Sequence, residues 1–340
     1  MLKACRNDRL SSKRNRKKLT RLSVDEIVRN NLKNSRILIT GGSGFVGRNL
    51  VATLTSLECE HLTFPDSHEL DLTNQSEVFK YFQDHRPQIV IHLAGKVGGI
   101  GINRDRLGEF FYQNAMIGIL VYEASRLYGV KKLISLAAGC GYPDSIQPPF
   151  HEAQFFDGLP DRNSYGYSLA KKNLVVQGWA YRDQYQFDST VLLPANLYGP
   201  HDNFDLYSSH VVPALINKFS RAVSEDAKEV VLWGTGIATR EFLFVADAIE
   251  AIIRTCNTKL VGPFNIGTGK ETSIRELADT LAEITGFKGS IKWDPSMPDG
   301  QTRRFYDMTS FSKTFNWMPS TTLRDGLQIT YQWFLDKHKL

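Results

Sequence analysis

The sequence predicts an α/β protein built on a doubly wound, mostly parallel sheet, with a smaller carboxyl-terminal α/β lobe. Short apolar runs rich in β-branched residues alternate with helical patterns through the first 200 residues, as in repeated βαβ units. The first run ends in the glycine-rich stretch GGSGFVG, residues 41–47, directly before a helical pattern. The alternation stops near residue 197, where loop-rich sequence begins, and this change predicts the second lobe.

The expected elements follow one another at βαβ spacing. The stretches IVIHL and TVLLP are almost continuously apolar, which is typical of parallel strands covered on both faces. A capping-box pattern, Ser23 with Glu26, predicts a short helix before the first strand. In the first half we expect strands at 36–40, 61–64, 87–95, 131–138 and 188–196, and helices at 48–57, 76–85, 107–128 and 163–185. In the second half we expect helices at 210–223 and 273–286, and a return to the sheet around 242–255 and 263–267.

The charge of the chain is concentrated at its amino end. Residues 1–22 carry nine basic residues and one acidic residue, whereas the remainder carries 32 basic and 35 acidic residues. Such a basic segment suits contact with nucleic acid or anionic lipid, an organelle transit peptide, or a disordered leader, and it lacks the apolar region of a secretory signal. The body itself is mildly acidic, so we expect it to bind no nucleic acid.

The composition is typical of a globular protein, with 42% hydrophobic and 23% charged residues. No apolar run approaches the roughly 20 residues that cross a bilayer, so we expect no membrane span. The four cysteines (Cys5, Cys59, Cys140 and Cys256) show neither a CxxC pair nor metal-ligand spacing. We therefore expect reduced thiols, a cytoplasmic location and no metal site.

The glycine-rich stretch predicts a dinucleotide site. Gly41, Gly44 and Gly47 lie between a strand and a helix. A tight turn requires the first glycine, close approach of a pyrophosphate favours the second, and helix–strand packing favours the third. The first N–H groups of the following helix then face the phosphates. This places a Rossmann-type NAD(P)-binding domain at 35–196, with a return segment at about 241–268. Residues 1–34 are the basic leader and short helix, and 197–240 with 269–340 form the substrate-binding lobe.

The choice of coenzyme stays open. Asp66 follows the second expected strand, and Asp71 lies further on, within reach of an adenine. Neither a clear acid for a ribose 2′-hydroxyl nor a clear arginine for a 2′-phosphate follows that strand, because Ser67 and His68 stand there.

Tyr167 and Lys171 form a Y-x-x-x-K pair within an expected helix. Residues four apart share a helix face, so the ammonium group can lie beside the phenol. A nearby cation favours the phenolate and is expected to lower the pKa of the tyrosine. This arrangement suits proton exchange with a carbonyl or alcohol during hydride transfer.

With this pair in place, the sequence resembles the extended short-chain dehydrogenase/reductase family, which includes the NAD-dependent epimerases and dehydratases, and within it the GDP-L-fucose synthases. The resemblance covers about residues 35–338. The stretches that carry it are AGKVGGI (94–100), YQNAMI (112–117), CGYP (140–143), YSLAK (167–171), PANLYGPHDNF (194–204), SHVVPAL (209–215), LWGTGIATREFL (232–243), PDGQTRR (298–304) and TYQWFLD (330–336).

The resemblance implies an NAD(P)-dependent enzyme that epimerises C3 and C5 of a GDP-linked 4-keto-6-deoxy sugar and then reduces C4. Tyr167 and Lys171 match the reductase pair, Cys140 matches the epimerisation base, and His210 matches the acid on the opposite face. A thiolate and an imidazole suit this role, because their pKa values lie near enough to neutrality to remove and return protons acidified by a carbonyl. The resemblance also implies NADP, with NAD as the alternative, and a homodimer formed through a helix pair that includes the Tyr167 helix.

Further positions match binding sites of the family. The implied cofactor-binding residues are Gly41, Gly44, Phe45, Val46, Gly47, Asp71, Leu72, Leu93, Ala94, Gly95, Lys96, Tyr167, Lys171, Pro194, Asn196, Leu197 and His210. The implied substrate-binding residues are Asn196, Val211, Lys218, Trp233, Arg240 and Arg304. The cations can neutralise a pyrophosphate, and Trp233 could pack against a base or ribose or belong to the core.

One position departs from the family pattern. The resemblance implies a serine or threonine four residues before Tyr142, where its hydroxyl would bind the C4 oxygen, but this chain has Ala138 there and Gly139 next. Ser135 is three residues too early and faces the other way on an extended strand. A water, another hydroxyl or a different substrate could compensate. The alternatives are therefore C3/C5 epimerisation alone, C4 epimerisation of another nucleotide sugar, or a nucleotide-binding pseudoenzyme.

Overall fold

The structure is a computed structural model that describes residues 26–98, 100–206, 208–297 and 299–338. A six-stranded sheet lies at its centre, with strand order β10-β5-β4-β3-β1-β2 and every neighbouring pair parallel. The strands of this sheet are β1 (Ile37–Thr40), β2 (Leu62–Thr63), β3 (Ile89–His92), β4 (Lys132–Leu136), β5 (Ser189–Pro194) and β10 (Phe264–Ile266). The predicted α/β fold with a doubly wound parallel sheet is confirmed.

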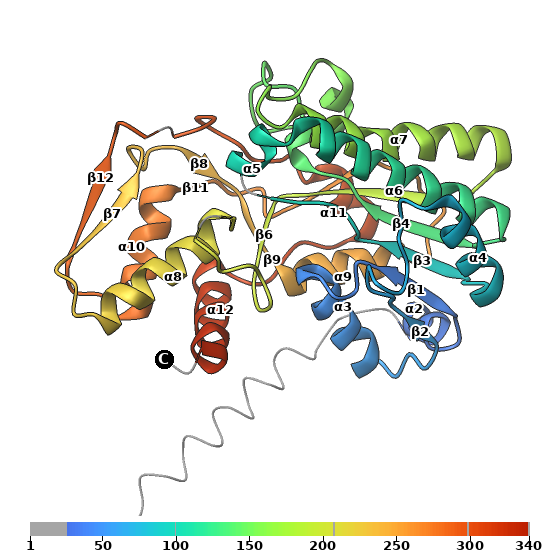
Figure 1. Cartoon of the computed structure of the whole chain (residues 1–340), viewed down its shortest axis with the longest axis horizontal. Coiled ribbons are helices and arrows are strands. Elements are labelled where there is room, and N and C mark those ends of the chain that lie inside the picture. The colour runs from blue at the N-terminus through green and yellow to red at the C-terminus, as the bar shows by residue number, and fades with distance from the viewer. Residues whose placement is uncertain (1–25, 99, 207, 298, 339–340) are drawn as a thin grey trace, which may run out of the picture.

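Helices cover both faces of the sheet (Figure 1). Leu38, Val90 and Leu133 are neighbours in register, and all three pack under the helices of one face. These helices are α4 (Gln75–His85), α6 (Leu107–Leu127) and α7 (Tyr165–Tyr185). The opposite face is covered by α3 (Phe45–Ser56) and α9 (Val245–Thr255), which contact each other. Since both faces are buried, the strands are mostly apolar, as their sequence indicated.

The sheet has a topological switch point at β1. The chain runs from β1 to β2 on one side and then crosses to β3 on the other, so the loops after β1 and β3 diverge at the carboxyl edge of the sheet. Ligands of open α/β sheets bind in the crevice at such a point. The fold therefore places GGSGFVG at the mouth of a ligand site.

A smaller lobe follows β5 and lies at the other end of the molecule in Figure 1. Its paired strands are β7 (Glu229–Trp233) with β12 (Ser290–Asp294), in parallel, and β8 (Thr239–Arg240) with β11 (Thr272–Ser273), antiparallel. Its larger helices are α8 (Val211–Ser224), α10 (Ile274–Thr285) and α12 (Leu323–His338). Helix α10 contacts both α8 and α12, which gives the lobe its own packed interior.

The remaining elements are short. They are α2 (Glu26–Lys33), α5 (Ile100–Asp105), α11 (Thr309–Phe315), the 3₁₀ helices η1 (Gly139–Gly141) and η2 (Glu152–Phe156), and strands β6 (Asn196–Tyr198) and β9 (Phe242–Phe244). The predicted cap Ser23 and the basic leader lie outside the described residues.

One expected strand lies elsewhere than predicted. The segment around 263–267 joins the sheet as β10, beside β5. The residues Phe242–Phe244 do not join it: they form β9, which pairs with β6 in a separate two-stranded sheet. Because β4 and β10 already flank β5, no edge of β5 is left for β9, and the apolar run pairs with the continuation of the β5 segment instead.

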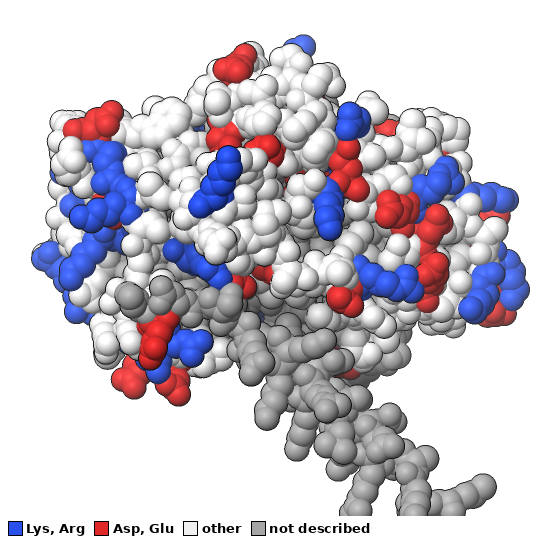
Figure 2. Space-filling model, turned by 180° about the vertical axis from the view of Figure 1, so that it is seen from behind, with Lys and Arg blue, Asp and Glu red and all other residues white. Residues whose placement is uncertain are grey.

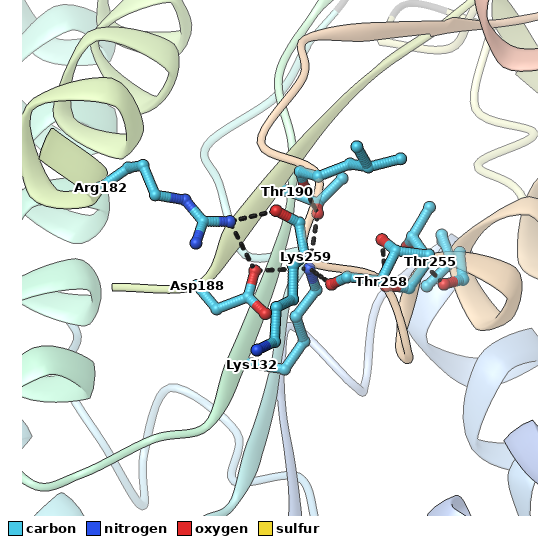
Figure 3. Close-up of polar contacts among 9 residues, drawn as sticks. Lys132, Arg182, Asp188, Thr190, Thr255, Thr258 and Lys259 are labelled. Carbon is cyan, nitrogen blue, oxygen red and sulfur yellow. Dashed lines mark hydrogen bonds and ion pairs between the residues drawn. The ribbon is translucent and has the colours of Figure 1, made fainter. Parts of the chain in front are cut away.

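A polar cluster lies where β4 and β5 begin, at the edge of the sheet away from the glycine loop (Figure 3). Lys132 is 4% exposed, and its Nζ donates to Asp188 Oδ1 at 3.0 Å and to Thr190 Oγ1 at 2.7 Å. It also donates to the Thr258 carbonyl, while Arg182 lies 3.3 Å from the same Asp188 oxygen. We call Lys132, Arg182, Asp188, Thr190 and Thr258 the amino-edge cluster; it fastens the loop before β10 to the sheet.

Candidate active site

The loop between β1 and α3 has room for glycine alone at two positions. Gly41 has φ +76°, and a Cβ there would lie 2.8 Å from the backbone nitrogen of Ala94. A Cβ at Gly47 would lie 2.1 Å from the Gly41 carbonyl oxygen, because the first turn of α3 folds tightly onto the loop. Both overlaps involve backbone atoms, which cannot move aside. The loop therefore lies flat against the loop after β3.

The amino end of α3 faces this loop without a side chain to cap it. Its N-cap is Gly44, and Phe45 and Val46 begin the helix half-buried against the core. The first N–H groups of a helix have no partner within the helix and favour an anion. An uncapped twelve-residue helix next to a glycine loop at the switch point fits the pyrophosphate of a dinucleotide.

The loop after β3 forms the second wall of the crevice. Leu93, Ala94 and Gly95 are half-buried and Lys96 is exposed. The buried Asn114 side chain, from α6, accepts from the Lys96 N–H at 3.0 Å and donates to the Lys96 carbonyl at 3.1 Å. Asn114 was not predicted as a site residue, although a lone amide on the apolar face of a helix signals a buried hydrogen-bonding role.

The region expected to hold the adenosine contains Asp71 and Leu72, of which the first is exposed and the second half-buried. Hydrogen bonds from the Thr73 hydroxyl and N–H lower the pKa of Asp71, so this carboxylate stabilises the turn in which it lies. Phe64 lies closer to the glycine loop, since a Cβ at Gly42 would be 2.5 Å from the Phe64 Cβ. Phe64 is 45% exposed and offers an apolar surface beside the loop.

Tyr167 and Lys171, the predicted reductase pair, lie on the side of α7 that faces the loop after β3 and the end of β4. Lys171 is buried, with its Nζ 5.9 Å from the centre of the Tyr167 ring and 3.4 Å from both the Ala94 and Leu136 carbonyl oxygens. A Cβ at Gly95 would come within 3.1 Å of that Nζ, so the cofactor wall and the lysine touch. Burial lowers the pKa of Lys171 to about 8.

Tyr167 differs from the expectation in one respect. Burial, and secondarily a charge on Cys140, raise the pKa of its phenol, whereas the sequence predicted a lowered pKa. The prediction was wrong for the free protein because desolvation of the phenolate outweighs a cation that is itself desolvated. The phenol is therefore held protonated, which is the form required to give a proton to a carbonyl oxygen.

Cys140 lies in η1, just after β4, and is half-buried. A charge on it raises the pKa of Tyr167 and of Tyr306 and favours the charged form of Lys171. These influences place the thiol, the two phenols and the ammonium group in one electrostatic neighbourhood. The structure thus brings together three of the four predicted catalytic residues.

The fourth, His210, lies on a separate element as the N-cap of α8. Its residue surface is exposed, yet enough protein surrounds the ring that desolvation lowers its pKa. Val211 follows it, half-buried, in the first turn of α8. A neutral imidazole at this position can accept or, once protonated, return a proton.

The segment after β5 forms the floor of the crevice. Pro194 ends β5, and Asn196 and Leu197 begin β6. The Asn196 amide donates to the Glu241 carbonyl at 2.9 Å, which ties β6 to β9. Asn196 is exposed and Leu197 half-buried, so both are accessible from the crevice.

Arg240 and Arg304 lie close enough that the charge of Arg304 lowers the pKa of Arg240, to about 10, in addition to the larger effect of burial. Arg240 donates to the Thr239 carbonyl at 2.7 Å and the Gln301 carbonyl at 2.6 Å, and Arg304 lies 3.4 Å from the Gln301 side chain. Two guanidinium groups in one neighbourhood are typical of a site for a doubly charged anion.

The other two predicted substrate residues lie further out on the lobe. The Lys218 ammonium donates to the Val231 carbonyl at 3.2 Å, and partial burial lowers the pKa of this lysine. Trp233 ends β7 and is 65% exposed, so it does not belong to the core. An exposed indole is free to stack on a flat ring.

A buried carboxylate of the site, Glu241, was not predicted. Glu241 is 1% exposed, and its carboxylate accepts from the Gly269 N–H at 2.7 Å and the Tyr306 N–H at 2.8 Å, and from Thr268. Burial raises the pKa of Glu241 to about 7, against the opposing effect of these donors. Glu241 therefore holds the Tyr306 segment against the floor of the crevice. The adjacent Arg240 was predicted, and a carboxyl in an otherwise apolar run was the available signal.

No helix among the described residues is long and apolar enough to cross a membrane. Within the same residues, no group of three or more histidine, cysteine or carboxylate side chains is arranged to hold a metal ion. On the face shown in Figure 2, basic side chains lie beside acidic ones over much of the surface, with uncharged areas between them.

Comparison with known proteins agrees with this geometry. The family model of the NAD dependent epimerase/dehydratase family matches residues 37–267. The chain is 38% identical over 304 residues to GDP-L-fucose synthase 1 of Arabidopsis thaliana, covering 89% of this chain and 94% of that protein.

Two solved structures are similar along almost their whole length. One is a GDP-L-fucose synthetase from Naegleria fowleri bound to NADP, with a TM-score of 0.84 and 28% identity over 90% of this chain and 94% of that one. The other is a GDP-mannoheptose C4 reductase from Campylobacter jejuni with NADP bound, with a TM-score of 0.81 and 30% identity over 89% and 98%. With the glycine loop, the Tyr167–Lys171 pair and these matches together, the chain belongs to the NAD-dependent epimerase/dehydratase family.

Proposed function

We propose that this protein is an NADPH-dependent epimerase and reductase that acts on a GDP-linked 4-keto-6-deoxy sugar. The observation that carries the proposal is the position of Cys140 in η1, which contacts α7, the helix that carries Tyr167 and Lys171. A thiol next to a phenol–ammonium pair combines a group that can move a carbon-bound proton with a group that can protonate a carbonyl oxygen. The resemblance to GDP-L-fucose synthases and GDP-heptose reductases, several with NADP bound, supports the substrate class and the coenzyme.

In the epimerase step, the Cys140 thiolate removes a proton from the carbon next to the C4 carbonyl, and the pair of electrons moves into an enolate. His210, in its protonated form, delivers a proton to the opposite face of that carbon. Tyr167 donates a hydrogen bond to the enolate oxygen, and the Lys171 ammonium stabilises the same charge. The Cys140 thiol then releases its proton to solvent and the His210 imidazole takes one up, and the same sequence at the other carbon of the pair inverts it in turn.

In the reductase step, bound NADPH supplies a hydride to C4. The side chains of the protein protonate the C4 oxygen and hold the sugar ring. Tyr167 gives its proton to the C4 oxygen, and the adjacent Lys171 ammonium offsets the charge that the phenol acquires. Arg240 and Arg304 bind the pyrophosphate of the nucleotide, and Trp233 stacks against the base or ribose.

The position of Ala138 favours a second candidate, C3/C5 epimerisation without reduction, because the hydroxyl that the family places there is missing. One experiment distinguishes the two candidate functions. Protein incubated with GDP-4-keto-6-deoxy-mannose in deuterated water is expected to incorporate deuterium at C3 and C5, and to oxidise NADPH when it is added. Deuterium uptake without NADPH oxidation would establish the second candidate, and the absence of both would refute the substrate assignment.

Replacement of Cys140 by serine is expected to abolish deuterium uptake, because a serine hydroxyl is far too weakly acidic to replace the thiolate. Mass spectrometry of the recovered sugar measures the uptake. The matched control is Cys59→Ala, which changes a buried cysteine at 7% exposure outside the crevice and should leave uptake unchanged. Uptake by Cys140→Ser at the wild-type rate would remove the thiol from the mechanism.

We also propose that the protein is a homodimer through α6 and α7. These two helices pack on each other and expose large apolar side chains, including Phe111 (48%), Ile119 (40%) and Val176 (47%). Apolar groups of this size on neighbouring helices are typical of an interface. The variant Val176→Glu is expected to elute as a monomer in size-exclusion chromatography with light scattering. Val223→Glu on α8, at a site 40% exposed, is the control and should stay dimeric. A monomeric wild type would overturn the proposal.

A further inference from the structure

We propose that Tyr306 supplies the hydroxyl that the loop after β4 lacks, by donating a hydrogen bond to the C4 carbonyl oxygen beside Tyr167. The inference rests on the proposed function and names a further catalytic residue for it. It begins from the loop itself, where Ala137, Ala138 and Gly139 carry no hydroxyl.

The Tyr306 hydroxyl occupies the space that a side chain at residue 139 would fill. A Cβ built on Gly139 would lie 1.5 Å from the Tyr306 Oη and 2.8 Å from its Cζ. No other side chain could stand at 139 while Tyr306 keeps this position. The glycine at residue 139 thus leaves the space in which the Tyr306 phenol packs.

The hydroxyl also lies within the catalytic neighbourhood. Burial raises the pKa of both Tyr306 and Tyr167, and a charge on Cys140 raises both further. For Tyr306, the lowering effect of Arg304 and the raising effect of Glu241 are larger than that of Cys140. Residue 139 adjoins both Ala138 and Cys140 in the chain, so a hydroxyl at the 139 side-chain position lies beside the loop that carries both residues. Burial keeps Tyr306 protonated, as a donor must be.

The hydroxyl has two polar neighbours, the Pro194 carbonyl, to which it donates, and the Arg304 side chain, which donates to it. Tyr306 Oη donates to the Pro194 carbonyl at 3.2 Å, which is long for an O–H···O hydrogen bond. Rotation about the Cζ–O bond is enough to turn the proton from Pro194 toward another acceptor. An oxygen that gains negative charge during hydride transfer is a much stronger acceptor than an amide carbonyl.

The other hydroxyls next to the loop are already committed. Ser135 lies under α6, where its Oγ pairs with the Tyr122 hydroxyl at 2.8 Å. The Tyr142 hydroxyl donates to the Asn265 side chain at 2.7 Å, and both groups are buried. Tyr306 is the hydroxyl adjacent to this loop, among the described residues, whose bond can be exchanged at little cost.

The backbone around Tyr306 holds the phenol in place. Its N–H donates to Glu241 at 2.8 Å, and its neighbours pair with Phe150 through hydrogen bonds of 2.9 Å on each side. Its ring lies 5.7 Å from the Tyr142 ring and 6.3 Å from the Phe150 ring. A donor held this firmly needs little reorganisation when charge develops on its acceptor.

The decisive experiment compares the full-length wild type with Tyr306→Phe, which keeps the ring and removes the hydroxyl. Loss of one such donor is expected to lower kcat for NADPH oxidation by about 10²–10³-fold, with KM nearly unchanged. Deuterium uptake without NADPH, which does not form the full alkoxide, should fall much less. A substrate labelled at C4 gives a second signature: its bound carbonyl stretch should move to higher frequency in Tyr306→Phe, as expected for a carbonyl that has lost a donor.

Two further variants keep the outcome interpretable. Ala138→Ser combined with Tyr306→Phe should recover much of the lost kcat, because it returns a hydroxyl to the loop. Tyr142→Phe removes a buried hydroxyl from the same aromatic group and should keep the wild-type kcat. Wild-type kcat in Tyr306→Phe, or no recovery in the double variant, would overturn the inference while leaving the proposed function intact. A wild type that never oxidises NADPH would instead refute the reductase function itself.

Discussion

Tyr167→Phe is expected to lower the rate of NADPH oxidation by about 10²–10⁴-fold, the usual worth of a positioned proton donor. Burial holds the phenol protonated, and Lys171 lies 5.9 Å from its ring, so the hydroxyl is the proton donor that this variant removes. Absorbance of the nicotinamide band measures the effect. Deuterium uptake at C3 and C5 should persist at a reduced rate, since Cys140 still removes the proton.

The control for this variant lies two residues away. Tyr165 begins α7 and is 42% exposed, so Tyr165→Phe removes a hydroxyl from the same helix without touching the crevice. It should match the wild type in both reactions. If Tyr167→Phe reduced its substrate as fast as Tyr165→Phe, the proton would have to come from elsewhere, and the role that the Y-x-x-x-K pattern predicts would be wrong.

The central fold was predictable because its signals are local. A buried parallel strand is apolar by composition, and the glycine stretch between β1 and α3 restricts the backbone in a way that few other sequences need. The strand at 242–244 was not predictable in the same way. Its three apolar residues fit either the central sheet or the pair with β6, and the choice depends on which edge of β5 is free, which is a property of the assembled sheet.

The spatial relation of Tyr167 to Lys171 was also predictable, since a helix fixes it. The pKa of Tyr167 was not. The spacing of the two residues predicts the nearby cation but not how deeply both groups are buried. Burial decides whether the pKa of Tyr167 rises or falls. The contact between Gly139 and Tyr306 was equally hidden. It joins residues 167 positions apart, so nothing in the local sequence of either one points to the other.

Glu241 and Asn114 are buried polar residues that hold the backbone around the candidate site in place. Asn114 fixes the backbone of the cofactor wall from beneath, and Glu241 fixes the segment that carries Tyr306. Each is a buried polar group whose hydrogen bonds all go to backbone atoms or neighbouring side chains of the site. Burial of such groups is tolerated only when their bonds are made, so their positions define the geometry of the crevice as firmly as its apolar core does.

The largest effect on stability is expected from Lys132→Ala in the amino-edge cluster (Figure 3). Lys132 is buried next to Asp188 and Thr190, so its removal leaves a partly buried carboxylate with Arg182 as its remaining cation, at 3.3 Å. Removing one partner of a buried ion pair typically costs about 3–5 kcal/mol in free energy of unfolding. The cost in free energy of unfolding should lie at the lower end of this range, because Asp188 keeps 19% of its side chain exposed. Urea unfolding followed by circular dichroism measures the change.

Two further substitutions show whether charge or packing is responsible. Lys131→Ala, at the exposed neighbouring position, should change the free energy of unfolding by less than about 0.5 kcal/mol. Lys132→Met keeps the buried stem but not the ammonium, so a loss close to that of Lys132→Ala would assign the effect to the charge.

Burial lowers the pKa of Lys132, which means that the unfolded chain binds this proton more tightly. The wild type should therefore gain stability relative to Lys132→Met as the pH rises from the folded pKa toward the unfolded one. A stability difference that stays flat across that interval would show that Lys132 is not desolvated in solution and that the cluster is open to water.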